Sequence, residues 1–155
     1  VQPVRGRLER AVISQTGAPV YVDYAHTPDG LRAAIEALRP HTKGRLITLF
    51  GAGGDRDAGK RPQMGKVAAD LSDHVIVTDD NPRSEEPSAI RAAVLAGAPQ
   101  AQEIGGRRDA IAAAIAQAGA DDIVLLAGKG HEQGQIIGDR VLPFDDVTVA
   151  RECAG

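Results

Sequence analysis

The stretch LITLF, residues 46–50, and its counterpart IVLLA, residues 123–127, decide the fold class of this chain. Both are short apolar runs of the kind found in parallel sheets, where helices cover both faces and each side chain is buried whichever way it points. Ala-rich segments of helical character alternate with such runs along the chain. The sequence therefore predicts an α/β fold: a Rossmann-like, mostly parallel sheet with helices on both faces.

The alternation of elements extends over the whole sequence. Strands are expected at residues 10–14, 20–23, 45–50, 74–78, 101–104, 123–127 and 135–137. Helices are expected at residues 28–38, 63–71, 87–96, 107–117 and 147–152. Pro28 and Pro87 support two of these helices, because a first helical turn tolerates a residue without an N–H group.

Composition narrows the class of protein. The 155 residues suit a single domain, and 43% hydrophobic with 25% charged residues is ordinary for a globular protein. A net charge of -3 and an aromatic content of 3% argue against a nucleic-acid partner. No apolar run reaches the roughly 20 residues of a membrane span. The lone Cys153 fits a reducing compartment, and the start without Met suggests a domain boundary within a larger protein.

Polar, Gly-rich loops follow four of the expected strands. They are DYAHTPD (23–29), FGAGGDRDAGKRP (50–62), DDNPRSEEP (79–87) and GKGHEQG (128–134). The carboxyl ends of parallel strands share one edge of a sheet, and ligands bind at that edge. The sequence therefore predicts a pocket formed by these four loops.

The glycine loop does not match the common nucleotide-binding motifs. Arg56 occupies the third glycine position of a dinucleotide fingerprint, which argues against an oxidoreductase. Residues 54–60 match GxxxxGK, but Arg61 replaces the Ser or Thr that would hold magnesium. A flexible loop with surface charges therefore remains an alternative for this segment. The sequence also shows no nucleophile–base pair, which argues against a self-contained hydrolase.

The DDNPR segment permits two interpretations. Its Asp and Asn residues could simply cap a turn before Pro82. Arg83 is harder to explain in that way, because a guanidinium at a sheet edge can form paired hydrogen bonds to a ligand carboxylate. Asp23 and His26 lie at another strand end, but no second His or Cys nearby gives them metal-ligand spacing.

Five segments together resemble a known family. GRLE, DYAHTPD, FGAGGDRDAGKRPQMG, TDDNPRSEEP and AGKGHEQGQ occur in the order and approximate spacing of the C-terminal domain of Mur ligases, most similar to the members that add meso-diaminopimelate. The resemblance runs from about Gly6 to the end of the chain. It implies that residues 1–155 are the amino-acid-binding and lid domain of a three-domain cytoplasmic ligase. The N-terminal domain and the central ATPase domain would then lie outside this chain.

The resemblance also implies an activity. Such a ligase joins meso-diaminopimelate to UDP-N-acetylmuramoyl-L-alanyl-D-glutamate through an acyl phosphate, as a step of peptidoglycan synthesis. ATP and Mg2+ would be bound mainly by the central domain, and the UDP-linked dipeptide through the other two domains. The isolated domain, expected to be a monomer, would hold no catalytic residue and no metal, and would not catalyse ligation.

The family's site residues carry over onto matching positions of this sequence. The amino-acid site would comprise Arg56, Asp80, Asn81, Pro82, Arg83, Gly128 and Glu132. The nucleotide side would comprise Arg7, Asp23 and His26. Lysine-adding relatives lack the arginine of DNPR, so Arg83 favours diaminopimelate. The alternatives are a ligase that adds L-lysine or another amino acid, and a free-standing binding module without catalysis.

Overall fold

A computed structural model of the chain describes residues 8–54, 59–129 and 134–154. The main sheet contains β1 (Glu9–Ile13), β2 (Pro19–Asp23), β3 (Leu46–Phe50), β4 (His74–Val77), β5 (Gln102–Glu103) and β6 (Ile123–Ala127). The helices are α1 (Pro28–Leu38), α2 (Lys60–Leu71), α3 (Pro87–Leu95), α4 (Arg107–Gln117) and α5 (Asp146–Ala154), with a short 3-10 turn, η1 (Arg39–His41), after α1. None of the helices described is long and apolar enough to cross a membrane.

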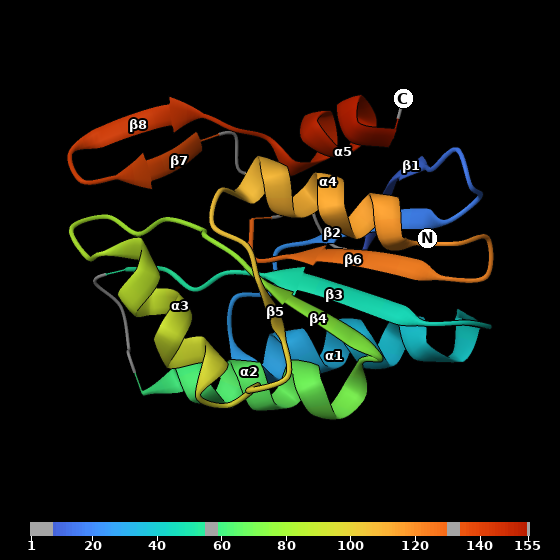
Figure 1. Cartoon of the computed structure of the whole chain (residues 1–155), viewed down its shortest axis with the longest axis horizontal. Coiled ribbons are helices and arrows are strands. Elements are labelled where there is room, and N and C mark those ends of the chain that lie inside the picture. The colour runs from blue at the N-terminus through green and yellow to red at the C-terminus, as the bar shows by residue number, and fades with distance from the viewer. Residues whose placement is uncertain (1–7, 55–58, 130–133, 155) are drawn as a thin grey trace.

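The topology confirms the predicted fold class. The strand order is β1-β2-β6-β3-β4-β5, and every pairing is parallel except that of β1 with β2. The chain advances from β2 to β5 and then returns to β6. Because such crossovers are right-handed, the reversal moves the connecting helix to the opposite face. Figure 1 shows this result: α1, α2 and α3 cover one face of the sheet, and α4 and α5 cover the other.

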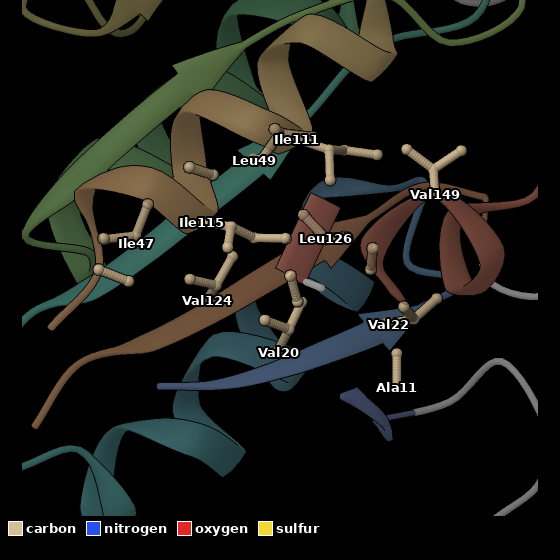
Figure 2. Close-up of a cluster of buried hydrophobic side chains, with 14 of the residues drawn as sticks. Ala11, Val20, Val22, Ile47, Leu49, Ile111, Ile115, Val124, Leu126 and Val149 are labelled. Atoms are coloured by element: carbon tan, nitrogen blue, oxygen red, sulfur yellow. The ribbon is translucent and has the colours of Figure 1, made fainter. Parts of the chain in front are cut away.

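Two apolar cores lie against the two faces of the sheet. All five residues of β3 and all five of β6 are buried, as their sequences predict. Figure 2 shows the core beneath α4 and α5, where Ile111 and Ile115 of α4 pack toward strand side chains such as Leu126. The second core joins α1, α2 and α3 to the opposite face. Burial of both faces fixes the positions of the strand ends.

The helix starts follow local chemistry. At α1 the Thr27 hydroxyl accepts a hydrogen bond from the Gly30 N–H at 3.1 Å, and Pro28 occupies the first turn. The start of α2 was expected at Gln63, but the helix begins at Lys60. The difference arises because Pro62 falls within the first turn, where a proline does not break a helix.

A hairpin outside the main sheet is the largest difference from expectation. The expected strand at 135–137 is β7 (Gly134–Ile137), and it pairs antiparallel with β8 (Arg140–Pro143), which was not predicted. Together they form a separate two-stranded sheet (Figure 1). Gly138 and Asp139 connect the strands, with Gly138 at a φ of 62°. The expected strand at 101–104 is reduced to the two exposed residues of β5 at the sheet edge.

A buried ion pair joins the helices above the sheet to the strand ends. The Arg107 and Asp146 side chains are both fully buried, with Nη2 2.7 Å from Oδ2 and Nε 2.8 Å from Oδ1. The same guanidinium donates to the carbonyls of Asp79 at 3.1 Å and Ala127 at 3.0 Å. Arg107 therefore connects the first turns of α4 and α5 to the residues that follow β4 and end β6.

Replacing Arg107 by Met should strongly destabilise the fold. The change leaves the Asp146 carboxylate buried without its partner, which typically costs about 3–5 kcal/mol. Urea unfolding of the 155-residue chain measures the loss. The neighbouring Arg108 offers a matched control, because its side chain is exposed and pairs with the exposed Glu152. Arg108→Met should leave the unfolding midpoint nearly unchanged, and equal losses for the two variants would contradict this role of Arg107.

A second network anchors the opposite end of the sheet. Asp122 accepts hydrogen bonds from the Arg45 N–H at 2.7 Å, the Gly119 N–H at 2.8 Å and the Arg45 guanidinium at 3.1 Å. Burial by itself raises the pKa of Asp122, but these bonds to the charged form outweigh it and hold the pKa below its ordinary value. The carboxylate therefore ties the turn before β6 to the start of β3.

The stability contributed by Asp122 should disappear at low pH. Because its pKa is lowered on folding, the contribution is complete above the unfolded pKa of about 3.9 and is lost as pH falls through the folded pKa. Asp122→Asn keeps the shape but exchanges one acceptor oxygen for a donor. Urea midpoints should differ most between the two chains near neutral pH and converge as pH falls below about 4. A difference that stays constant with pH would contradict the assignment.

Candidate functional site

The four predicted loops gather at one edge of the sheet. Strands β2, β6, β3 and β4 are adjacent and parallel, so their carboxyl ends lie side by side. A cavity of about 330 Å³ opens among the loops that follow them. Five of the predicted site residues line it: His26, Asp80, Asn81, Arg83 and Gly128. Arg7, Arg56 and Glu132 lie outside the described residues.

The glycine loop approaches the DDNPR loop at backbone distance. The Gly54 N–H donates to the Asn81 carbonyl at 2.7 Å. A Cβ on Gly54 would lie 1.8 Å from the Pro82 carbonyl oxygen, and one on Gly51 would lie 2.6 Å from the Asp79 carbonyl carbon. Neither position has room for a side chain. Pro82 thus contributes to the site through this packing. The two glycines are required because the backbones of the two loops lie in direct contact.

Arg61 is a structural residue of the same loop. Its side chain is 7% exposed, and its Nη2 lies 2.6 Å from Glu85 Oε2. Nη2 also donates to the Gly53 carbonyl at 3.1 Å. For this residue, the alternative of a flexible loop with surface charges is wrong, because the guanidinium is buried and joins the glycine loop to the segment after Arg83.

The two aspartates of DDNPR have different environments. Asp79 turns away from the cavity, toward Arg91 Nη1 at 2.5 Å and the Gly106 N–H at 3.1 Å. Burial by itself lowers the pKa of Arg91, but hydrogen bonds to Glu103 and Asp79 outweigh it and raise the pKa above its ordinary value. Asp79 therefore anchors α3 and the turn before α4, which leaves Asp80 as the acid that lines the cavity.

Asp80 is a buried acid beside a buried base. The residue is 7% exposed, and its Oδ1 lies 3.3 Å from Lys129 Nζ. The pair has a favourable charge contact, but its angles do not make a hydrogen bond, and Oδ1 has no hydrogen-bond partner among the described residues. Oδ1 is itself buried, so it is Oδ2, which accepts no hydrogen bond from a described residue, that keeps acceptor capacity at the wall of the cavity.

Arg83 is held in an unusual backbone conformation. Its φ of 53° lies in the left-handed region, which costs a non-glycine residue about 1–2 kcal/mol. The β7–β8 hairpin holds it there: the Arg83 N–H donates to the Ile136 carbonyl at 3.0 Å, and the Gly138 N–H donates to the Arg83 carbonyl at 2.5 Å. Nη1 donates to the carbonyls of Gly54 at 3.0 Å and Asn81 at 3.3 Å. The other guanidinium N–H groups bond to no described residue.

A second cavity, of about 430 Å³, lies beside the first. Asp23 lines it, and His26 lines both cavities. The Asp23 oxygens accept from the N–H groups of Leu8 at 3.0 Å and Ala25 at 2.7 Å. Each oxygen keeps a second lone pair, so the carboxylate can still accept from a ligand hydroxyl. The structure therefore brings the predicted nucleotide side next to the predicted amino-acid side.

Sequence reasoning missed the hairpin and Lys129. A signal for the hairpin was present, because Gly-Asp between two short β-type runs is a known two-residue turn. Lys129 lay within a quoted motif, but its burial depends on residues far along the chain. No group of three or more potential metal ligands occurs in the described parts of the chain.

Comparison with known proteins identifies the family. Residues 6–130 match the family described as Mur ligase, glutamate ligase domain. A UDP-N-acetylmuramoyl-L-alanyl-D-glutamate–2,6-diaminopimelate ligase from Zymomonas mobilis is 73% identical over 98% of this chain and 32% of its own length. The protein of the same name from Caulobacter vibrioides is 63% identical over 92% of this chain and 29% of its own length. The chain thus spans about a third of these relatives.

A solved structure agrees with the sequence comparison. A structure of a UDP-N-acetylmuramoyl-L-alanyl-D-glutamate–2,6-diaminopimelate ligase superposes with a TM-score of 0.90 at 42% identity. The superposition covers 99% of this chain and 32% of that one. Since the family match extends over most of the sequence and the fold agrees with it, this chain belongs to the Mur ligase family, within its glutamate ligase domain.

Proposed function

We propose that this chain is the amino-acid-binding and lid domain of an ATP-dependent ligase that adds meso-2,6-diaminopimelate to UDP-N-acetylmuramoyl-L-alanyl-D-glutamate. The observation that carries the proposal is the placement of Asp80, Asn81 and Arg83 around one cavity. The names of relatives with up to 73% identity support the same reaction. The parts of those relatives outside the matched third would bind the UDP-linked dipeptide and most of the ATP and Mg2+.

The cavity offers the groups that a zwitterion needs. Diaminopimelate has two ammonium–carboxylate centres; one amine must stay free to react, and the other centre can be recognised. Asp80 provides an acceptor for an ammonium, and Arg83 provides donors for a carboxylate. The cavity volume of about 330 Å³ is within the range of small-molecule sites. Arg56 and Glu132 complete the proposed amino-acid site.

Arg83 is the basis for choosing diaminopimelate over lysine. Lysine has the same chain length but no distal carboxylate, so it would leave the Arg83 guanidinium without a carboxylate partner. An unsatisfied donor of this kind costs about 1–3 kcal/mol, and more when it is charged. Sites that bind a polar group in this way reject analogues that lack it.

The nucleotide would meet the chain at the second cavity. We propose that Asp23 accepts hydrogen bonds from ribose hydroxyls and that Arg7 lies near them, while His26 lies toward the phosphates. ATP, when bound, supplies the phosphoryl group that activates the acceptor carboxylate. The chain's own residues would close over the nucleotide, exclude water and hold the incoming amine, and His26 lines both cavities at their junction.

Arg83→Ala in the full-length ligase should weaken diaminopimelate binding selectively. Loss of a charged hydrogen-bonding group should raise the KM for diaminopimelate on the order of 10- to 100-fold, with little change in the KM for ATP. Arg83→Lys keeps the charge but loses the planar pair of donors, so it should reduce the preference for diaminopimelate over lysine. Steady-state kinetics with the two amino acids in competition measures both effects.

A surface arginine provides the matched control. Arg39 is exposed and pairs with Asp73 far from the cavity, so Arg39→Ala should leave every KM unchanged. A KM for diaminopimelate that is unchanged in Arg83→Ala would show that Arg83 does not bind this substrate. An unaltered enzyme that prefers lysine would refute the proposed substrate itself.

A further inference from the structure

Lys129 is a fully buried lysine at the junction of three segments. Its side chain is 0% exposed. Nζ donates to the Gly134 carbonyl at 2.6 Å and to Asn81 Oδ1 at 3.2 Å, and it lies 3.3 Å from Asp80 Oδ1. The first two neighbours accept hydrogen bonds from the ammonium, and the third is a charge contact. Because the Lys129 side chain is fully buried and does not line the cavity, any effect it has on the site must act through its neighbours.

The neighbour most affected is the Asn81 side chain. Asn81 Oδ1 accepts from Lys129 Nζ and from the Ile136 N–H, which lies 2.9 Å away. Because both of these groups are donors, the oxygen end of the amide must face them. The NH2 end in that place would set donor against donor. Asn81 Nδ2 makes no hydrogen bond to any described residue, and Asn81 lines the cavity. The amide thus offers the cavity a donor.

We propose that Lys129 is a positioning residue that sets the polarity of the amino-acid site. It fixes the Asn81 amide with Nδ2 available to the cavity, and it holds the Asp80 carboxylate at the same wall. Asn81 would then bind a ligand carboxylate, while Asp80 would bind a ligand ammonium. This inference rests on the proposed function, since it assumes that the cavity takes a zwitterionic amino acid.

The geometry explains why a lysine serves here. The Phe144 ring centroid lies 6.0 Å from Nζ, so part of the surroundings is apolar. A charged group in such a place is stable only when it is well paired. The two acceptors of Lys129 are Asn81 Oδ1 in the loop after β4 and the Gly134 carbonyl at the start of β7. They lie 48 and 5 residues from Lys129 in the sequence. A neutral side chain would leave Asp80 without its counter-charge and Asn81 with a single bond to Ile136.

The test uses Lys129→Met in the full-length ligase. Met fills a similar space without the charge, so the KM for diaminopimelate should rise at least about tenfold. The KM values for ATP and for the UDP-linked dipeptide should stay within about threefold, which a general loss of structure would not permit. Lys66→Met is the matched control, because Lys66 on α2 is 72% exposed. It should leave all three KM values unchanged.

Asn81→Asp tests the orientation of the Asn81 amide independently of whether Lys129→Met folds. Asn81→Asp has the same shape and keeps an oxygen toward Lys129 and Ile136, so its thermal unfolding midpoint should stay near that of the unaltered enzyme. It replaces the donor toward the cavity by a carboxylate oxygen, so calorimetry should show binding of diaminopimelate weakened by at least about tenfold. Retained affinity in Asn81→Asp would overturn the assigned orientation.

Two other outcomes would overturn the role of Lys129. One is an unchanged KM for diaminopimelate in Lys129→Met. The other is an equal rise in all three KM values with a matching fall in the unfolding midpoint, which would show a purely structural role. Failure of the proposed function looks different: the unaltered enzyme would then prefer another amino acid. In that case the same comparison, made with the preferred amino acid, decides the role of Lys129.

Discussion

The buried pairing of Arg107 with Asp146 is the constraint on which the site edge depends. Parallel strands end in carbonyl groups that need donors once their loops diverge. Arg107 supplies donors to two of them, at Asp79 and at Ala127. These are the residues from which the DDNPR loop and the GKGHE loop begin. One guanidinium, held in place by the Asp146 carboxylate, therefore joins α4 and α5 to the starts of the DDNPR loop and the GKGHE loop.

Charged residues at this edge divide into those that build the loops and those that face the cavity. Asp79 pairs with Arg91, whereas Asp80 lines the cavity. Arg61 is likewise paired with Glu85, whereas Arg83 keeps N–H groups that bond to no described residue. The charged side chains that pair with each other inside the protein stabilise the loops. The groups left with unused capacity are the ones suited to a zwitterionic ligand.

Local sequence predicted the parts of the structure that local chemistry determines. The apolar runs at 46–50 and 123–127 indicated strands buried on both faces, and the loops after them indicated the ligand edge. The β7–β8 hairpin was incomplete in that prediction, because β8 is exposed and has no buried face to give it a pattern. The burial of Lys129 could not be predicted either, since the Asn81 side chain that accepts its hydrogen bond lies 48 residues away in the sequence. Which acid of DDNPR faces the cavity also depends on a distant partner, the arginine of α3.

The hairpin gains its importance from the same long-range contacts. The Gln135 side chain donates to the Asp80 carbonyl at 2.7 Å, and the Ile136 N–H donates to the Asn81 side chain at 2.9 Å. The Arg83 backbone is bonded to the hairpin through both its N–H and its carbonyl. Asp80, Asn81 and Arg83, the residues of the proposed site in this loop, are thus each hydrogen-bonded to the segment 135–138 of the hairpin. Because β8 is exposed along its length, its pairing with β7 contributes little buried apolar surface. The hairpin is therefore better explained as a support for the recognition loop than as part of either apolar core.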